Sequence, residues 1–438
     1  MEVDLTKYPS SSQIAELYKK SRTLEDLLGN QNEVYVRGRL FQKGDKIVLY
    51  DRGAYLDVQI SNGATFSNGD LVIVKGQYSE GNPLRVDEVT LCARCEGNFE
   101  EVLDSNRYTG ISLVLDGERR KLLVLRSNVL KAVRGYLNNQ GFIEVETPIL
   151  QYHPDCAPVP TFKTREGSSG HEYHLKICPE EFIKRLAFGF DKIYDLGKCF
   201  RNGESSEKHS PEFTMLEAYE TFSTFEDSMK LTERLIEHVA KEVNGTTKVN
   251  YRGFEIDFKT SWKRISVDEA SKRFYGKSVF ELNEGELREI VGLPEIKLRK
   301  PDLIRIFMEK ELEHRFIQPT FLTYYPSSSG SPEKNTPNNP PTKEQGEAFV
   351  ARGIEIANVG EVNNDPRYLE RHSTNNVINK FGEDKIEENL DRDFLYEMSF
   401  GLPPISGLGI GVDRLIMILG GVTDIRKTQA YPFRNGEK

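Results

Sequence analysis

Two separated segments of this sequence carry the side chains best suited to chemistry on charged groups. The first, residues 200–217, holds an arginine, a histidine, aromatic residues and several carboxylates within one short span. The second, residues 407–415, combines glycines with another arginine. A guanidinium can bind a phosphate and a carboxylate through paired hydrogen bonds, and glycine lets a backbone approach a ligand closely. Together the segments indicate charge stabilisation of phosphate groups, which requires no nucleophilic side chain.

Both segments resemble signature motifs of one enzyme family. Residues 200–217 resemble motif 2 of class II aminoacyl-tRNA synthetases, residues 407–415 resemble motif 3, and the lysyl-like subclass is the closest. The resemblance extends from Val34 to Phe433. It implies that the chain activates an amino acid with ATP, using arginines and Mg²⁺ rather than a covalent side chain.

The resemblance also implies which residues bind the nucleotide. Arg201 contacts the α-phosphate and the substrate carboxylate, His209 reaches the distal phosphates, and Phe213 and Arg414 stack on the two faces of adenine. Arg201 and Arg414 are the implied catalytic pair. The family's Glu-Gly pair that follows Asn202 is exchanged here, so the glutamate that reads adenine is displaced by one position. The implied ATP-binding set is Arg201, Glu204, His209, Phe213, Gly411 and Arg414.

Two glutamates are implied ligands of Mg²⁺, which accompanies polyphosphates and prefers carboxylate oxygens. They are Glu347 and Glu355, on a predicted antiparallel strand pair. Compared with the family, this chain has one residue more between Glu347 and Glu355, and one fewer between Asn358 and Glu361. Either a β-bulge preserves both ends of the pattern, or a wall of the pocket has moved.

A further set of residues indicates a cationic amino acid. Glu180 stands near a predicted helix N-terminus, where the resemblance implies that it recognises an α-ammonium. Glu217 and Tyr219 lie two apart on a predicted strand and therefore face the same side. The resemblance implies that they bind an ε-ammonium, with Asn358 and Glu361 adding contacts. A pocket with many acids and no evident arginine favours lysine. The alternative is that Glu217 forms a structural ion pair.

Residues 33–95 alternate in the manner of five short strands with Gly, Asn and Asp between them. This pattern is typical of an OB-type barrel or of another small β-barrel. A helix is predicted over 12–29, which completes a first domain at 1–105. The resemblance implies anticodon binding, and the RNA contacts expected from residue types are Arg37, Arg39 and Lys46 for phosphates and Phe41 or Tyr50 for base stacking.

Residues 106–438 are predicted to form the catalytic domain, so the fold class is α+β: a barrel followed by an antiparallel sheet with flanking helices. A helix over 127–138 and a strand over 141–150 resemble motif 1, which forms the dimer interface in the family and implies a homodimer. An amphipathic helix that packs inside its own domain is the alternative. Further helices are predicted over 223–245 and, as an insertion, over 265–315.

Composition restricts the remaining function classes. The net charge of −9 is opposite to that of a chain that binds nucleic acid nonspecifically, and we expect no DNA partner. The sequence has no apolar run near the ~20 residues of a membrane span, and the acidic N-terminus lacks a signal-peptide pattern. Five cysteines are too few for a disulfide framework. Cys92 and Cys95 lack the further ligands of a zinc site. We therefore expect a cytoplasmic protein.

These observations predict a lysine–tRNA ligase that uses ATP and Mg²⁺ and has lysine and a tRNA as partners. Two alternatives stay open. A synthetase paralogue would ligate lysine or a related amino acid to a protein or small molecule, and the predicted barrel argues against it. A catalytically inactive RNA-binding or regulatory protein is the second, and the presence of Arg201, His209, Phe213 and Arg414 argues against that.

Overall fold

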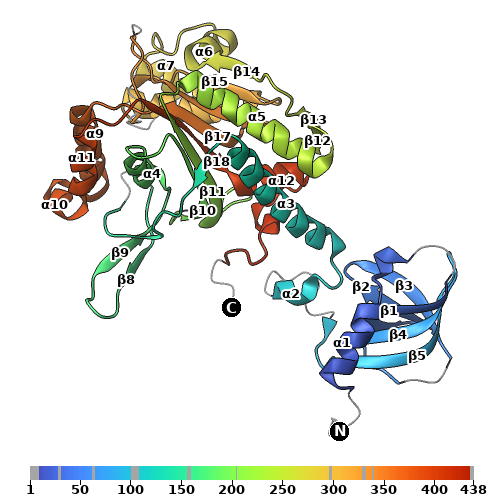
Figure 1. The fold of residues 1–438 in the computed structure, drawn as a ribbon. Coiled ribbons are helices and arrows are strands. Elements are labelled where there is room, and N and C mark those ends of the chain that lie inside the picture. The colour runs from blue at the N-terminus through green and yellow to red at the C-terminus, as the bar shows by residue number, and fades with distance from the viewer. Residues whose placement is uncertain are drawn as a thin grey trace. The chain divides into compact units, whose positions relative to one another are not determined.

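The computed structural model describes residues 9–27, 31–61, 65–99, 108–154, 159–203, 205–294, 298–327, 332–337 and 340–434. Glu204, from the implied ATP-binding set, therefore lies outside the described residues. The chain divides into two compact units, Met1–Val124 and Leu125–Lys438 (Figure 1).

The first unit contains a closed barrel of five strands in the order β1-β2-β3-β5-β4. The strands are β1 (Gln31–Lys43), β2 (Lys46–Asp51), β3 (Ala54–Ile60), β4 (Asp70–Tyr78) and β5 (Leu84–Ala93). Strand alternation defines the interior of the barrel, because Val36 and Leu40 are fully buried while Arg37 and Arg39 between them are partly exposed. The five strands expected from the sequence pattern are thus present.

The N-terminal helix is shorter than predicted. Helix α1 spans Ser11–Lys20, and Ser10 caps it by accepting a hydrogen bond from the backbone N–H of Gln13. The helix ends because Ser21 adopts an extended backbone and its N–H returns to the carbonyl of Leu17. The prediction of a helix over 12–29 is therefore wrong for residues 21–27, which include the short 3₁₀ segment Leu24–Asp26, and residues 28 and 29 lie outside the described residues.

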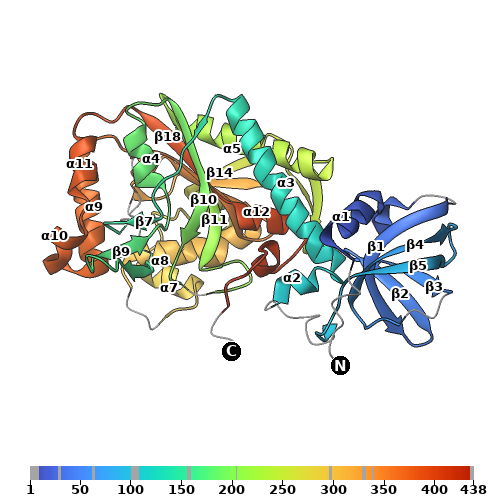
Figure 2. The same ribbon diagram turned by 60° about the horizontal axis from the view of Figure 1, so that its bottom comes forward.

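The second unit is built on an eight-stranded sheet whose pairs are mostly antiparallel (Figures 1 and 2). Only the two outermost pairs, β14 with β15 and β6 with β10, are parallel. In spatial order the strands are β14 (Lys263–Ser266), β15 (Thr320–Thr323), β16 (Gln345–Val350), β17 (Ile354–Glu361), β18 (Ile405–Gly411), β11 (Glu212–Thr221), β10 (Lys192–Phe200) and β6 (Ile143–Glu144). The predicted α+β class with an antiparallel-rich sheet is confirmed.

Helices pack along this sheet and at one end of it (Figure 2). Figure 1 shows α5 and α12 along the middle strands, and α9, α10 and α11 grouped beyond α4. The bounds are α2 (Thr109–Ser112), α3 (Gly117–Asn139), α4 (Glu180–Leu186), α5 (Phe225–Asn244), α6 (Val267–Tyr275), α7 (Glu284–Ile290), α8 (Lys300–Phe307), α9 (Pro366–Phe381), α10 (Ile386–Asn389), α11 (Arg392–Met398) and α12 (Val412–Leu419). In the part of the chain that the structure describes, no helix is long and apolar enough to cross a membrane.

Two predicted elements differ from the structure. Helix α3 begins ten residues earlier than the predicted 127–138 segment. The strand predicted over 141–150 is instead two short strands in different sheets, β6 and β7 (Leu150–Gln151). Pro148 separates them and offers no N–H for a continuous ladder. Strand β7 joins β9 (Glu172–Leu175) and β8 (Lys163–Arg165) in a small sheet, and β12 (Lys248–Tyr251) pairs with β13 (Phe254–Asp257).

The helices predicted over 223–245 and 265–315 are present. Thr224 caps α5 through a reciprocal pair of hydrogen bonds with Asp227. Helices α6, α7 and α8 surround their own core, in which Leu287, Leu303 and Phe307 are fully buried.

Candidate active site

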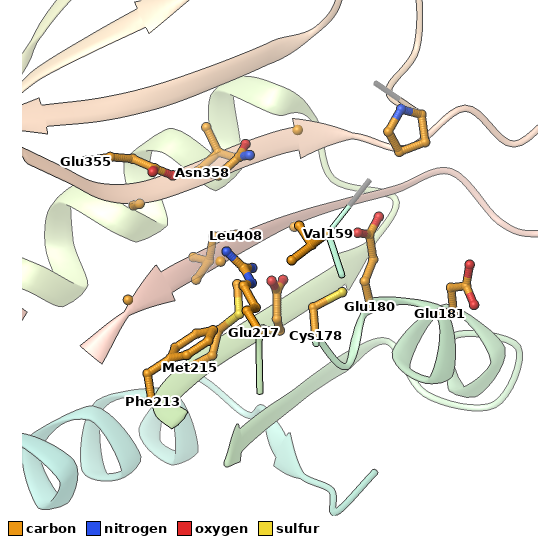
Figure 3. A pocket seen from close by; sticks show the side chains of 18 of the residues that line it. Val159, Cys178, Glu180, Glu181, Phe213, Met215, Glu217, Glu355, Asn358 and Leu408 are labelled. Carbon is orange, nitrogen blue, oxygen red and sulfur yellow. The ribbon is translucent and has the colours of Figure 1, made fainter. Parts of the chain in front are cut away.

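A cavity of about 740 Å³ lies in the second unit, lined by strands β11, β17 and β18 and by α4, α9 and α12. Figure 3 shows Phe213, Met215 and Glu217 in succession along β11, with Glu355 and Asn358 on β17 across the cavity. Glu180 and Glu181, at the start of α4, mark the opposite end from Phe213. We call the region of Arg201, His209, Phe213 and Arg414 the cationic end, and the region of Glu180, Glu217, Tyr219 and Glu333 the acidic end.

At the cationic end, Arg201 directly follows β10, and its guanidinium lies 5.1 Å from the centre of the Phe213 ring. Register explains this contact, because Cys199 and Phe213 are paired across β10 and β11. The Nε atom of Arg201 is buried and has no hydrogen-bond partner among the described residues. A buried donor without an acceptor is costly, so this guanidinium is suited to an anionic ligand such as a phosphate.

Arg414 reaches the same end from the first turn of α12. Its Nη1 donates to the carboxylate and to the backbone carbonyl of Glu355, both at 3.0 Å. The neighbouring Asp413 fixes the start of the helix, because this buried carboxylate accepts from the guanidinium of Arg126 at 2.7 Å and from the N–H of Thr214 at 2.6 Å. Sequence reasoning missed Asp413 and Arg126, whose roles depend on residues distant in the chain.

His209 is exposed to the open cavity, and its Nδ1 lies 2.8 Å from the Ser206 hydroxyl. Partial desolvation by surrounding protein atoms, followed by the charges of Arg414 and Lys208, lowers the pKa of His209 to about 4. The imidazole is therefore neutral near pH 7. It can donate one hydrogen bond to a phosphate without bringing a full positive charge.

At the acidic end, Glu217 and Tyr219 are buried on β11 and face the cavity together, as the strand period requires. Burial, followed by the carboxylates of Glu180 and Glu217, raises the pKa of Tyr219 well above its usual value. The phenol thus stays protonated and can act as a hydrogen-bond donor or acceptor.

The glycines of β18 make room for these two side chains. Gly409 is paired with Glu217 and Gly407 with Tyr219. A Cβ atom on Gly409 would lie 2.5 Å from Oε1 of Glu217, and one on Gly407 would lie 2.4 Å from the Tyr219 ring. At Gly411, by contrast, the nearest atom to an added Cβ would be Cδ of Arg414 at 3.8 Å. Gly407 and Gly409 therefore serve the acidic end, whereas the sequence pattern had suggested close approach to a nucleotide.

Glu180 does not stand alone at the acidic end. Its carboxylate pairs with the buried ammonium of Lys184 at 2.5 Å, one helical turn along α4. Burial acts to lower the pKa of Lys184, but the Glu180 carboxylate outweighs it and the pKa is raised. Lys184 also lines the cavity, so this end contains a cation that sequence reasoning did not place there.

The two implied metal ligands lie near each other on β16 and β17. Glu347 is paired with Asn358, so its side chain shares the face of β17 that carries Glu355 and Asn358, although Glu347 is not among the cavity-lining residues. Burial, followed by the carboxylates of Glu355 and Glu313, raises the pKa of Glu347 well above its usual value. Carboxylates crowded in this way favour a cation beside them.

Glu313 is a third carboxylate near this wall, and no sequence pattern pointed to it. Burial and then the Glu355 carboxylate raise the pKa of Glu313 to about 7. Among the described residues, no group of three or more His, Cys, Asp or Glu side chains is placed to hold a metal ion alone. The oxygens of Glu347 and Glu355 are of the type that Mg²⁺ prefers as ligands.

A β-bulge in β17 determines that Asn358 faces the cavity and that Glu361 does not. The register between β16 and β17 shifts so that Ile356 is left without a partner, which keeps Glu355 and Asn358 on the cavity face despite their three-residue spacing. The next residues alternate regularly, so Gly360 faces the cavity and Glu361 turns away. Of the two alternatives, a bulge is present, but it preserves only the first end of the pattern, because Glu361 leaves the cavity face.

Glu361 is consequently outside the cavity, which corrects its expected placement among the amino-acid contacts. It is buried and pairs with Lys334 at 2.6 Å. A different carboxylate, Glu333, lines the cavity instead. No role was assigned to Glu333 from the sequence.

In the barrel, the expected RNA-binding residues differ in their availability. Phe41 is buried and packs edge-on against Tyr50 and Phe99, so the expectation of base stacking by Phe41 is wrong. Arg37 and Arg39 both donate to backbone carbonyls of the barrel region, those of Ser21 and Gly69.

One exposed ring on this surface escaped sequence reasoning. Tyr55 is 67% exposed and stacks on Tyr50 with 5.6 Å between ring centres. Lys46, expected to contact phosphates, pairs with Asp57 at 2.7 Å. Cys92 and Cys95 are free thiols.

The chain is similar to known proteins over most of its length. A family model described as tRNA synthetases class II (D, K and N) matches residues 102–435. A lysine–tRNA ligase of Listeria innocua is 32% identical over 444 residues, covering 94% of this chain and 89% of that protein. A lysine–tRNA ligase of Clostridium novyi is 36% identical over 336 residues, covering 74% of this chain and 66% of that protein.

Proposed function

This chain belongs to the class II tRNA synthetases (D, K and N), and on that premise we propose that it activates lysine with ATP and transfers it to a tRNA. One observation carries the proposal. A single cavity combines Arg201, whose buried Nε has no hydrogen-bond partner in the described part of the chain, with the buried carboxylate of Glu217 on the adjacent strand. An amino acid with a carboxylate at one end and an ammonium at the other matches this separation of charge.

The proposed chemistry needs no side-chain nucleophile. The lysine carboxylate attacks the α-phosphorus of ATP, forming an oxygen–phosphorus bond while pyrophosphate leaves. Arg201 binds the α-phosphate and the attacking carboxylate, Phe213 and Arg414 hold the adenine between them, and neutral His209 donates to the distal phosphates. A terminal hydroxyl of the tRNA then attacks the acyl carbon and releases AMP. Orientation and charge stabilisation supply the rate enhancement.

We assign Mg²⁺ to Glu347 and Glu355, where it would neutralise phosphate charge when bound. The crowding of these carboxylates with Glu313 supports the assignment. Glu355 forms an ion pair with Arg414. This pair would keep the Glu355 carboxylate and the Arg414 guanidinium at the cationic end before a nucleotide binds.

For the amino acid, we assign the α-ammonium to Glu180 and the side-chain ammonium to Glu217 and Tyr219, with Asn358 as a polar contact. All four line the cavity. The pairing of Glu180 with Lys184 holds its carboxylate at the start of α4.

We further propose that the first domain is an OB fold that binds the tRNA anticodon. The closed five-stranded barrel supports this assignment. The most suitable stacking surface is the pair Tyr50 and Tyr55, since Tyr55 is largely exposed. We also propose that this first domain ends near residue 105. Finally, we propose that the protein acts in the cytoplasm.

A homodimer is also proposed. Three apolar side chains that follow α3 are about half exposed: Ile143 at 47%, Ile149 at 46% and Leu150 at 52%. Several exposed apolar side chains close together in the sequence suggest a surface that another protein covers. An interface related by two-fold symmetry would cover them. Sedimentation should give about twice the monomer mass, and a monomer at micromolar concentration would contradict the proposal.

The decisive experiment is ATP–pyrophosphate exchange with each of the twenty amino acids, with and without tRNA. Lysine should drive exchange best, and lysine should then be transferred to tRNA. Exchange driven better by aspartate or asparagine would refute lysine as the substrate. Adenylate formation without charging of any tRNA would refute the second half of the proposal and favour a paralogue that uses another acceptor.

A further inference from the structure

Glu333 holds a defined position beside the acidic end. Its backbone forms an isolated antiparallel bridge with Val362, just beyond β17. The ammonium of Lys343 donates to the Glu333 carbonyl at 2.8 Å, and the N–H of Lys334 donates to the carbonyl of Glu361, also at 2.8 Å. The Lys334 hydrogen bond belongs to the bridge, so residue 333 is held beside the end of β17 by this bridge and is tied separately to Lys343.

The side chain of Glu333 lies over Gly360. A Cβ atom added to Gly360 would be 2.6 Å from Cγ of Glu333 and 3.3 Å from its Oε1. Both residues line the cavity. The bulge in β17 brings Gly360 to the cavity face, and the missing side chain at this position leaves the space that the Glu333 side chain occupies. Glycine at 360 and glutamate at 333 thus form one packed unit in the cavity wall.

Charge at this end supports a ligand contact for Glu333. Its carboxylate is among the groups that raise the pKa of Tyr219 and of Lys184, after burial and closer acids in each case. Of the ionisable side chains at this end, Lys184 pairs with Glu180, and Glu361 is outside and pairs with Lys334. Glu217 and Glu333 both line the cavity, and both carboxylates contribute to the raised pKa of Tyr219.

We propose that Glu333 is a specificity-determining residue that receives the side-chain ammonium of the amino acid together with Glu217 and Tyr219. The resemblance suggested Glu361 as an additional carboxylate, but strand alternation turns Glu361 away and the segment at 332–337 supplies Glu333 in its place. This inference rests on the proposed activation of an amino acid by the same cavity. It extends that function by naming the carboxylate that distinguishes a cationic side chain from an uncharged one.

The test uses the full-length protein and the variant Glu333→Gln, which keeps the shape of the side chain and removes its charge. Pyrophosphate exchange is measured with lysine and with norleucine, which lacks the terminal ammonium. We expect the KM for lysine to rise roughly 10- to 100-fold, with the KM for ATP unchanged. The ratio of kcat/KM for lysine to that for norleucine should fall by a similar factor. Glu333→Asp should recover part of the preference.

Glu344→Gln is the matched control, because Glu344 lies on the segment that pairs with Lys334 but does not line the cavity. It should leave the preference for lysine unchanged. The inference is overturned if Glu333→Gln keeps the wild-type KM for lysine, or if it weakens lysine and norleucine equally. Failure of the proposed function looks different: the wild-type protein itself would show no exchange driven by lysine, which would overturn the proposed role of Glu333 as well.

Discussion

The two ends of the cavity are built in different ways. The cationic end takes Arg201, His209 and Phe213 from one short stretch around β10 and β11, and Arg414 from the helix that follows β18. The acidic end combines a strand, the start of α4, a bulged strand and the segment at 332–337. One insertion or deletion leaves the first set in place but changes which residues face the second. Phosphate chemistry can therefore persist while substrate selection changes.

The largest expected effect tests whether the cationic end acts on the nucleotide. Arg201→Ala should lower the rate of pyrophosphate exchange by roughly 100- to 1000-fold, because it removes a charge aimed at the α-phosphate, worth about 3–4 kcal/mol. Arg414→Ala should act in the same direction. Exchange kinetics are compared with Arg392→Ala, which alters an exposed arginine paired with Glu387. Wild-type exchange in a folded Arg201→Ala protein would remove the nucleotide assignment.

At the acidic end, Glu217→Gln should raise the KM for lysine about 10- to 100-fold and leave the KM for ATP nearly unchanged, since the lost charge faces only the amino acid. Glu220→Gln is the control on the same strand, where Glu220 is half-exposed and pairs with Lys192. If the two KM values moved together, the cavity would not separate its two ligands as described.

A smaller effect is expected outside the cavity. Tyr55→Ala should reduce the efficiency of tRNA charging roughly five- to thirtyfold, because one base loses its stacking surface, while pyrophosphate exchange stays at the wild-type level. Phe41→Ala should instead lower the melting temperature, since Phe41 is buried. Unchanged charging by Tyr55→Ala would exclude this ring from the RNA-binding surface.

The smallest effect concerns Glu313. Its pKa of about 7 lies above that of the unfolded chain, so the protonated form is favoured in the folded state and stability is lost as pH rises from about 4.5 through 7. Glu313→Gln should therefore raise the melting temperature by a few degrees at pH 8 and hardly change it at pH 4.5. An equal shift at both pH values would show that the ionisation of Glu313, opposed by burial and then by the Glu355 carboxylate, is not the cause.

Sequence alone predicted much of this arrangement where local pattern determines the outcome. The five barrel strands, the start of α5 at Thr224 and the paired orientation of Glu217 and Tyr219 all follow from alternation or capping. What it missed depends on contacts between distant segments. The β-bulge at Ile356 changes which residues of β17 face the cavity, so Glu361 points away from it. The Glu333 side chain packs over Gly360 and lines the cavity instead. Asp413 was likewise indistinguishable from a surface acid until Arg126 was found beside it.

The glycines at 407 and 409 have a consequence for anyone who wishes to redesign the substrate pocket. Each is matched to one large side chain on the neighbouring strand, so positions 217 and 409 form one design unit, and 219 and 407 another. In a library that varies these positions one at a time, most variants would have either a steric clash or an unfilled cavity. Gly409→Ala displaces the Glu217 carboxylate unless a shorter residue replaces Glu217. New specificities are therefore to be sought among paired substitutions, with the backbone of β18 left as it is.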